Sequence, residues 1–302
     1  MIRLSGVTKT FDGFTALDGL DMHVPEGCVY GLVGPNGAGK STVIRHITGA
    51  LRPDAGEILV AGEPVWENTA VKARMALIPD EIFYFTQSNM NDMKKFYQSL
   101  YPGFDAELFT KIAGCFPELN TKKNIRSFSK GMQKQAAFAL SLAAKPDVLV
   151  LDEPVDGLDP VIRRQVWSLM LSEVAESGMT VLVSSHNLRE LEDVCDHVGI
   201  MNRGKIMLER SLSDLQGSVS KFQIAFSSAP EGGTVWPEGL DILHESGQGR
   251  VTTLIIRGDQ SEVEAKLAAL GPVILDVIPL TLEEIFIYEM GGAGYEVKDI
   301  LL

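Results

Sequence analysis

Apolar positions along the first part of the chain fall into short runs and helical repeats that follow one another in alternation. Short apolar runs between turn residues indicate strands, and apolar residues spaced three and four apart indicate helices. This pattern predicts helices at 41–51, 131–144, 160–176 and 188–194, and strands at 2–7, 17–24, 28–33, 58–61, 75–78, 148–151, 181–184 and 198–201. Strands that alternate with helices predict a parallel sheet covered by helices.

Two stretches depart from this alternation. From about residue 81 to 145 the apolar residues keep helical spacing, which predicts a helical insert. After a predicted linker at 216–218, the pattern predicts a helix at 261–270, strands at 222–226, 240–243, 251–257 and 273–278, and a final amphipathic helix through Leu282, Ile285, Phe286 and Met290. We therefore expect two domains, residues 1–217 with the insert, and a small accessory α+β domain at 218–302.

Composition and charge narrow the class of protein. Apolar residues make up 45% of the 302 residues and charged residues 22%, as in globular proteins. The net charge is −13, and residues 219–302 alone carry 5 basic and 13 acidic side chains. A field of this sign repels phosphate backbones, so we expect no nucleic-acid partner. The longest apolar region, 136–144, is far shorter than the roughly 20 residues of a membrane span, and the N-terminus has no signal-peptide pattern.

A glycine-rich loop follows the strand predicted at 28–33 and opens the helix after it. Its residues fit the pattern G-x-x-x-x-G-K-[ST]: Gly34, Pro35, Asn36, Gly37, Ala38, Gly39, Lys40, Ser41 and Thr42. Glycines let successive backbone N–H groups turn inward around phosphate oxygens, and the helix N-terminus favours the same anion. We expect Lys40 to contact the β- and γ-phosphates and the Ser41 hydroxyl to bind Mg²⁺.

Acidic and imidazole side chains follow two further buried strands. Asp152 and Glu153 end the apolar run that starts at residue 148, and His186 follows the run at 181–184. Ligands of parallel sheets bind beyond the carboxyl ends of the strands, where these residues are expected. The positions predict Asp152 in the Mg²⁺ shell, directly or through water, and Glu153 as the acceptor of a proton from an attacking water. His186 is expected either to contact the γ-phosphate or to orient that water.

These motifs and their order resemble the ATP-binding subunits of ABC transporters over residues 1–217. Phe128 and the segment Ser129, Lys130, Gly131, Met132 and Gln133 are similar to the signature sequence of that family. Asp159 matches the acid of its D-loop, His186 its switch histidine, and Phe11 the aromatic that stacks on adenine. The resemblance implies an α/β fold, a P-loop NTPase cassette with a RecA-like parallel sheet, an antiparallel β region and a helical subdomain.

Three positions in two motifs differ from the usual pattern of the family. The signature most often reads Leu-Ser-Gly-Gly-Gln, and here Lys130 and Met132 replace a glycine and the glutamine. The family usually carries a metal-linked glutamine where Asp80 stands, so Asp80 is a further candidate Mg²⁺ ligand. An ionised aspartate cannot donate the hydrogen bond that a glutamine donates.

The resemblance also implies partners and a place in the cell. One phosphate loop and one signature per chain require two chains, identical or homologous, to complete two ATP sites that use Mg²⁺. The segment 281–286 is similar to a bacterial exporter-type subset that includes YtrB-like and EcsA-like subunits. We therefore expect an ATPase that powers a separate membrane permease, at the cytoplasmic face of the membrane, with the insert as the partner-facing part. The candidates for that contact are Phe83, Tyr84 and Phe85; the alternative for each of them is packing in the core of the insert.

Two other classes of function stay open at this stage. One is a soluble ATP-dependent switch acting on the ribosome or DNA, a class that usually carries two cassettes or long coiled coils in one chain. The other is a regulator that binds nucleotide without hydrolysis, in which Glu153 and His186 would have no role.

Overall fold

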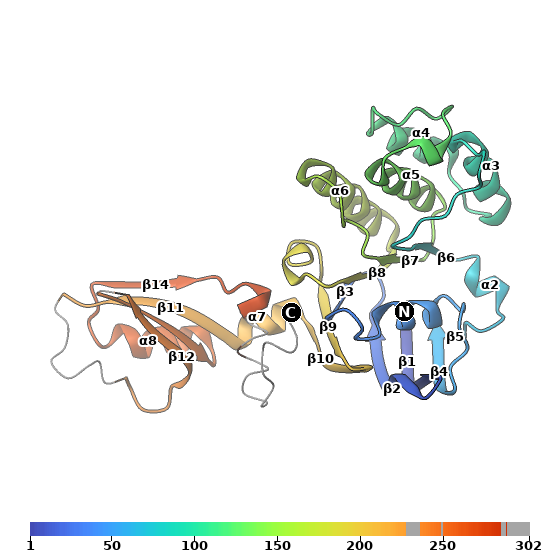
Figure 1. The fold of residues 1–302 in the computed structure, drawn as a ribbon. Helices are drawn as coiled ribbons and strands as arrows, with labels where there is room; N and C mark the ends of the chain where they lie inside the picture. The colour runs from blue at the N-terminus through green and yellow to red at the C-terminus, as the bar shows by residue number, and fades with distance from the viewer. Residues whose placement is uncertain (228–235, 249, 285–287, 289–302) are drawn as a thin grey trace. The chain divides into compact units, whose positions relative to one another are not determined.

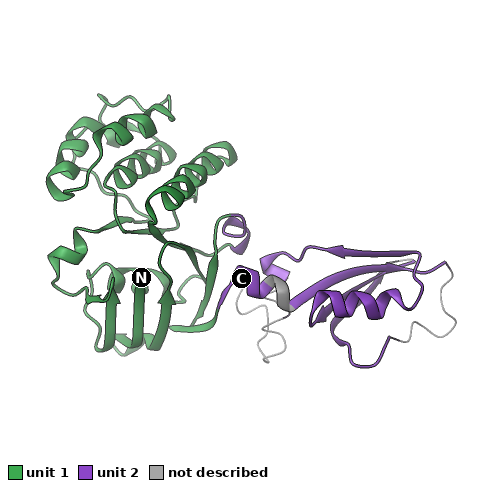
Figure 2. Ribbon diagram, turned by 180° about the vertical axis from the view of Figure 1, so that it is seen from behind, with its two compact units in different colours: residues 1–187, 194–209 green, residues 188–193, 210–302 purple. Residues whose placement is uncertain are grey.

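The computed structural model describes all residues except 228–235, 249, 285–287 and 289–302 (Figure 1). Contacts divide the chain into two compact units (Figure 2). The first consists of residues 1–187 and 194–209, and the second of residues 188–193 and 210–302. The division into domains after residue 217 stays a prediction.

The first unit contains an antiparallel sheet in the order β2-β1-β4-β5. Its strands are β1 (Ile2–Phe11), β2 (Phe14–Val24), β4 (Ala55–Val60) and β5 (Glu63–Pro64). The turn between β1 and β2 is the pair Asp12 and Gly13, both at positive φ (45° and 84°), as a tight two-residue hairpin requires. This turn places Phe11 and Phe14 directly opposite each other at the end of the hairpin.

A six-stranded sheet forms the centre of the same unit, in the order β10-β9-β3-β8-β7-β6. Its strands are β3 (Val29–Val33), β6 (Met75–Ile78), β7 (Val148–Asp152), β8 (Thr180–Ser185), β9 (His197–Asn202) and β10 (Lys205–Ser211). Every residue of β3, β7 and β8 is buried, the pattern of parallel strands covered on both faces. Register pairs Val33 with Ser185 and Asp152 with Ser184, so the carboxyl ends of β3, β7 and β8 meet at one edge.

The helices of this unit are α1 (Lys40–Ile47), α2 (Thr69–Lys72), α3 (Met90–Leu100), α4 (Ala106–Gly114), α5 (Lys130–Ala143) and α6 (Pro160–Ser177), with a 3₁₀ turn η1 (Ile125–Ser127). Figure 1 shows α3 to α6 gathered at one end of the unit and the antiparallel sheet at the other. Side-chain caps begin these helices: Asn89 for α3, Asp105 for α4, Ser129 for α5 and Asp159 for α6. The predicted α/β cassette with its helical insert is confirmed.

The second unit is built on a four-stranded sheet in the order β12-β13-β11-β14. Its elements are α7 (Leu212–Ser218), β11 (Val219–Ala225), β12 (Asp241–Gln248), β13 (Val251–Arg257), α8 (Gln260–Ala268), β14 (Ile274–Ile278) and the 3₁₀ turn η2 (Leu188–Glu190). Val263 and Leu267 of α8 share a buried core with Phe222, Leu254 and Ile256 of the sheet. The predicted α+β character is therefore present.

Several predicted elements differ from the structure. The helix expected at 188–194 is wrong: only the three residues of η2 are helical there. Leu188 and Leu191 are buried all the same, so the turns here cover the apolar side chains without a continuous α-helix. The linker expected at 216–218 is the last turn of α7, which Ser211 caps. Strand β10 was not predicted; its apolar run is only three residues long, Ile206 to Leu208, and none of its residues is fully buried.

The predicted final helix falls mainly outside the described residues. Residues 282–284 are helical and Leu282 is buried, whereas Ile285, Phe286 and Met290 lie outside the described part. Among the described residues, no helix is both long enough and apolar enough to span a membrane.

Candidate functional site

The phosphate loop lies between β3 and α1, at the edge where the buried parallel strands end. Gly34 follows β3 directly, and a Cβ atom at this position would collide with the carbonyl oxygen of Met201 in β9. The backbone N–H of Ala38 donates to the carbonyl oxygen of Pro35 at 3.1 Å, which closes the loop on itself. The loop therefore has a defined shape that opens directly onto the N-terminus of α1.

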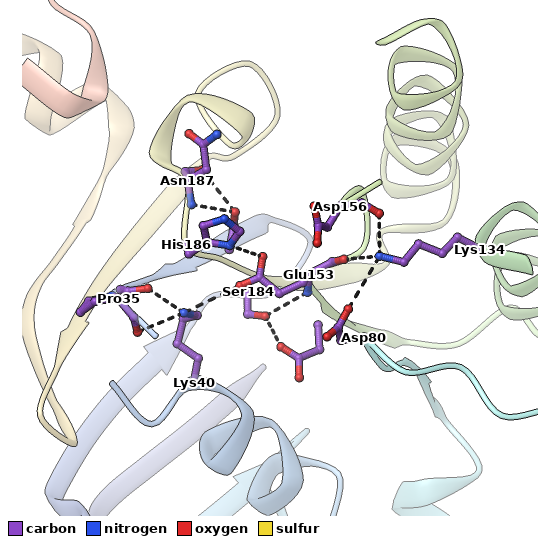
Figure 3. A network of polar contacts seen from close by, with 12 residues as sticks. Pro35, Lys40, Asp80, Lys134, Glu153, Asp156, Ser184, His186 and Asn187 are labelled. Carbon is purple, nitrogen blue, oxygen red and sulfur yellow. Dashed lines mark hydrogen bonds and ion pairs between the residues drawn. The ribbon is translucent and has the colours of Figure 1, made fainter. Parts of the chain in front are cut away.

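Lys40 is the first residue of α1 and is almost completely buried. Its Nζ donates to the carbonyl oxygens of Gly34 at 2.6 Å and Pro35 at 3.3 Å, and it lies 3.8 Å from Oε1 of Glu153 (Figure 3). Burial lowers the pKa of Lys40, while the carboxylates of Glu153 and Asp152 act in the opposite direction. The arrangement holds a cation, with its counter-charges, at the mouth of the loop.

Asp152 ends β7 and is buried, with Oδ1 accepting a hydrogen bond from the Ser184 hydroxyl of the neighbouring strand. Ser41 and Asp152 both line one pocket, which is described below. Within the described ranges, no three His, Cys, Asp or Glu side chains gather as a complete protein cage for a metal. Mg²⁺ is usually held by one or two protein oxygens together with phosphate and water, which fits a hydroxyl and one carboxylate.

Glu153 adopts a left-handed backbone conformation (φ 46°), which is unfavourable for a residue with a side chain. Its N–H donates to the carbonyl oxygen of Ser184 at 3.2 Å. Its Oε2 lies 3.0 Å from Nδ1 of His186, whose side chain is half-exposed (Figure 3). The carboxylate therefore stands between Lys40 and His186, as expected for residues at neighbouring strand ends.

A pocket of about 380 Å³ joins these groups. Its walls combine loop, strand-end and aromatic residues: Phe11, Phe14, Ala16, Asn36, Gly37, Gly39, Lys40, Ser41, Thr42, Asp80, Asp152 and Glu153. The structure thus brings the predicted phosphate, metal and base residues together around one space.

Two aromatic rings border this pocket, and only one of them was predicted. Phe11 is 40% exposed and Phe14 67% exposed, and the two are a cross-strand pair. The Nζ of Lys9 lies 5.5 Å above the ring of Phe11 and is itself paired with Asp54 at 2.7 Å. The turn Asp12–Gly13 with an aromatic on each side was the sequence signal that could have identified Phe14.

The predicted signature begins α5. The Ser129 hydroxyl accepts a hydrogen bond from the N–H of Met132, so this residue is the helix cap. Gln133 Nε2 donates back to the carbonyl oxygen of Phe128 at 3.0 Å. A second pocket, of about 520 Å³, is bordered by Ser129, Lys130, Gly131, Met132, Gly157, Leu158 and Asp159 among others. Ser129 and Lys40 border different pockets, so one chain does not bring them together.

Two acidic predictions have local partners as well. Asp159 Oδ1 accepts from the N–H groups of Val161 and Ile162, which makes this residue the cap of α6. Asp80 follows β6, and its half-exposed carboxylate lies 3.9 Å from Nζ of Lys134 in α5. Lys134 also contacts the loop after β7, and nothing in the sequence distinguished it from the other polar positions of its helix.

One of the three aromatics named as candidate partner contacts follows the alternative of core packing. Tyr84 is buried, and its hydroxyl donates to the carbonyl oxygen of Gln133 at 2.8 Å, because its ring packs inside the insert. Phe83 and Phe85 are exposed, at 74% and 48%.

Comparison with known proteins gives a consistent result. Residues 17–156 match the ABC transporter family. The chain is 31% identical to the ABC transporter ATP-binding protein YtrB of Bacillus subtilis (strain 168), over 97% of this chain and 99% of that protein. It is 35% identical to the daunorubicin/doxorubicin resistance ATP-binding protein DrrA of Streptomyces peucetius, over 72% of this chain and 67% of that protein.

A solved structure shares the fold of the first unit. The dimeric structure of MJ0796, a bacterial ABC transporter cassette, superposes with a TM-score of 0.64 at 21% identity. It covers 70% of this chain, and the match takes in 99% of that cassette.

Proposed function

Because this chain belongs to the family of ABC transporter ATP-binding proteins, we propose that it hydrolyses ATP with the residues of the strand-end pocket to power export through a separate membrane permease. The observation that carries this proposal is the convergence of Lys40, Asp152 and Glu153 around one pocket. His186 lies next to it, 3.0 Å from the carboxylate of Glu153 (Figure 3). The test is magnesium-dependent ATP hydrolysis by the purified chain, compared with variants at these positions.

Each side chain has a separate role in this proposal. Lys40 neutralises charge on the β- and γ-phosphates, since its ammonium is already held at the loop. Glu153 accepts a proton from the attacking water, and His186 orients Glu153 through the 3.0 Å contact and is available to the γ-phosphate. Ser41 and Asp152 are the residues that would hold Mg²⁺, and when bound the ion would neutralise phosphate oxygens.

Two chains form the complete sites in this proposal. The loop pocket of one chain and the Ser129 pocket of its partner bind opposite sides of the same triphosphate, because the N-terminus of α5 offers N–H groups to an anion. The two chains close on each other when the loop pocket of one and the Ser129 pocket of the other both bind the charged triphosphate.

Mixing two inactive variants tests this arrangement. We expect a Lys40→Met chain and a Ser129→Arg chain each to hydrolyse little ATP as homodimers. Their mixture should recover about a quarter of wild-type activity, because half of the dimers are then mixed and each has one intact site. Dimers that do not exchange partners give a false negative, so the two chains are unfolded and refolded together. No recovery after verified mixing would contradict the shared site.

We propose that the paired rings of Phe11 and Phe14 stack on the adenine base of ATP. Stacking contributes about 1–3 kcal/mol per base, so Phe11→Ala should raise the KM for ATP about tenfold with kcat nearly unchanged. Phe14→Ala should have a smaller effect in the same direction. Phe83→Ala removes an exposed ring that does not line the pocket and serves as the control. Unchanged KM in both pocket variants would place the base elsewhere.

Export and membrane attachment rest on the relatives. The name of DrrA concerns drug resistance, and that of YtrB concerns an ABC transporter. We propose the same class of work for this chain, on the cytoplasmic face, with Phe83 and Phe85 of the insert toward the permease. Co-purification with a multi-spanning membrane protein tests it, and co-purification with ribosomes instead would favour the soluble switch.

A further inference from the structure

Lys134 of α5 connects three parts of the molecule that are distant in sequence. Its Nζ donates to the carbonyl oxygen of Glu153 at 2.8 Å and to that of Asp156 at 3.0 Å, and it lies 3.9 Å from Oδ1 of Asp80 (Figure 3). The residue is only 6% exposed. Two of the three N–H donors of the ammonium therefore bind carbonyl oxygens, and the Asp80 carboxylate lies within ion-pair distance.

The contact with Glu153 fixes the peptide that follows the proposed base. Glu153 stands at positive φ, a conformation that persists only where the surroundings hold it. Ser184 holds its N–H from β8, and Lys134 holds its carbonyl oxygen from α5. The next residue, Pro154, has no N–H to offer the loop a further hydrogen bond. Loss of Lys134 therefore releases the carbonyl group of Glu153 and leaves only its N–H held, by Ser184.

The charge of Lys134 needs a partner as well. A buried ammonium is strongly unfavourable unless a carboxylate or several acceptors compensate it. Asp80 supplies a negative charge, at the position where the resembled family usually has a neutral glutamine. Asp80 and Lys134 thus form a pair in which the unusual acid has a specific partner.

We propose that Lys134 is a positioning residue for ATP hydrolysis, which aims Glu153 by holding its peptide, with Asp80 as the counter-charge of Lys134. The proposal rests on the base role proposed for Glu153. It assigns Asp80 to Lys134 rather than to Mg²⁺, and it gives the first turns of α5 a second role besides the Ser129 pocket.

The first experiment replaces Lys134 with methionine in the full chain. Lys134→Met should lower kcat about 10- to 100-fold, because small displacements of a catalytic group have effects of that size. The KM for ATP and the Kd of a fluorescent ATP analogue should stay within about threefold, since Lys134 does not border the nucleotide pocket. The matched control is Lys145→Met. Lys145 follows the end of α5 and forms a 2.7 Å ion pair with buried Glu173, which this substitution removes. Lys145→Met should lower Tm without changing kcat.

Further variants keep the test decisive if Lys134→Met does not fold. Lys134→Arg keeps the charge and the donors and should restore part of kcat, whereas Lys134→Gln should not. Asp80→Asn should lower kcat in the wild-type background and have little further effect when Lys134 is methionine. Wild-type kcat in folded Lys134→Met, with a Tm loss like that of Lys145→Met, would overturn the positioning role. Fully additive effects would overturn the Asp80 pairing.

The base role and the positioning role fail in different ways. Undiminished hydrolysis by Glu153→Gln removes the base role, and the positioning role with it. Inactive Glu153→Gln together with fully active Lys134→Met removes the positioning role alone.

Discussion

Replacing Glu153 with glutamine is expected to lower kcat for ATP hydrolysis by about 10²- to 10⁴-fold, the usual contribution of a general base. The amide keeps the size of the side chain and its contact range to His186 and Lys40, but it cannot accept the proton of the attacking water. Binding groups stay in place, so the nucleotide-bound dimer should accumulate. Phosphate release measures the first effect, and size-exclusion chromatography with ATP measures the second.

The matched control for this variant is Glu173→Gln. Glu173 is a buried carboxylate, and like the partly buried Glu153 it contacts a lysine, but it lies on α6 and does not line the pocket. We expect it to lower stability and to leave kcat unchanged. A Glu153→Gln protein that turns over ATP at the rate of Glu173→Gln would assign the base to another group.

Replacing Lys40 with methionine is expected to abolish measurable ATP turnover and to weaken ATP binding about 10- to 100-fold, since a hydrogen bond to a charged group contributes about 1.5–3 kcal/mol. Methionine fills the same buried space without the charge that faces the β- and γ-phosphates. Equilibrium titration with a fluorescent ATP analogue measures the affinity.

Lys72→Met is the control for the loss of a lysine. Lys72 Nζ donates to the carbonyl oxygen of Gly49 at 2.9 Å, as Lys40 does to Gly34, but it is remote from the pocket walls. Its affinity for nucleotide should equal that of the wild type. Equal affinities for Lys40→Met and Lys72→Met would contradict the assigned role of the loop.

The sequence could predict the parts of the site that follow from local pattern. A glycine-rich loop after a buried strand, and acids at the ends of other buried strands, are sufficient to place Lys40, Asp152 and Glu153 at one edge. The alternation of strands and helices likewise predicts the cassette, because buried parallel strands read as continuous apolar runs.

Features that arise only from tertiary contacts could not be predicted from the sequence. Phe14 becomes part of the pocket only because a hairpin places it opposite Phe11. Lys134 is one polar residue among several on α5, and its carbonyl partners come from a loop 19 and 22 residues away. The segment at 188–194 has apolar residues at helical spacing, yet burial of two leucines holds it as turns.

The close packing of Gly34 against the backbone of Met201 sets a minimum length for any truncated form of this protein. A fragment ending at residue 156 would contain the whole glycine-rich motif and both strand-end acids, but not β9. Without that strand, the carbonyl oxygen of Met201, which packs closely against Gly34, would be missing. Shortened versions intended for nucleotide binding should therefore extend through Asn202, well past the last residue whose chemistry touches the phosphate.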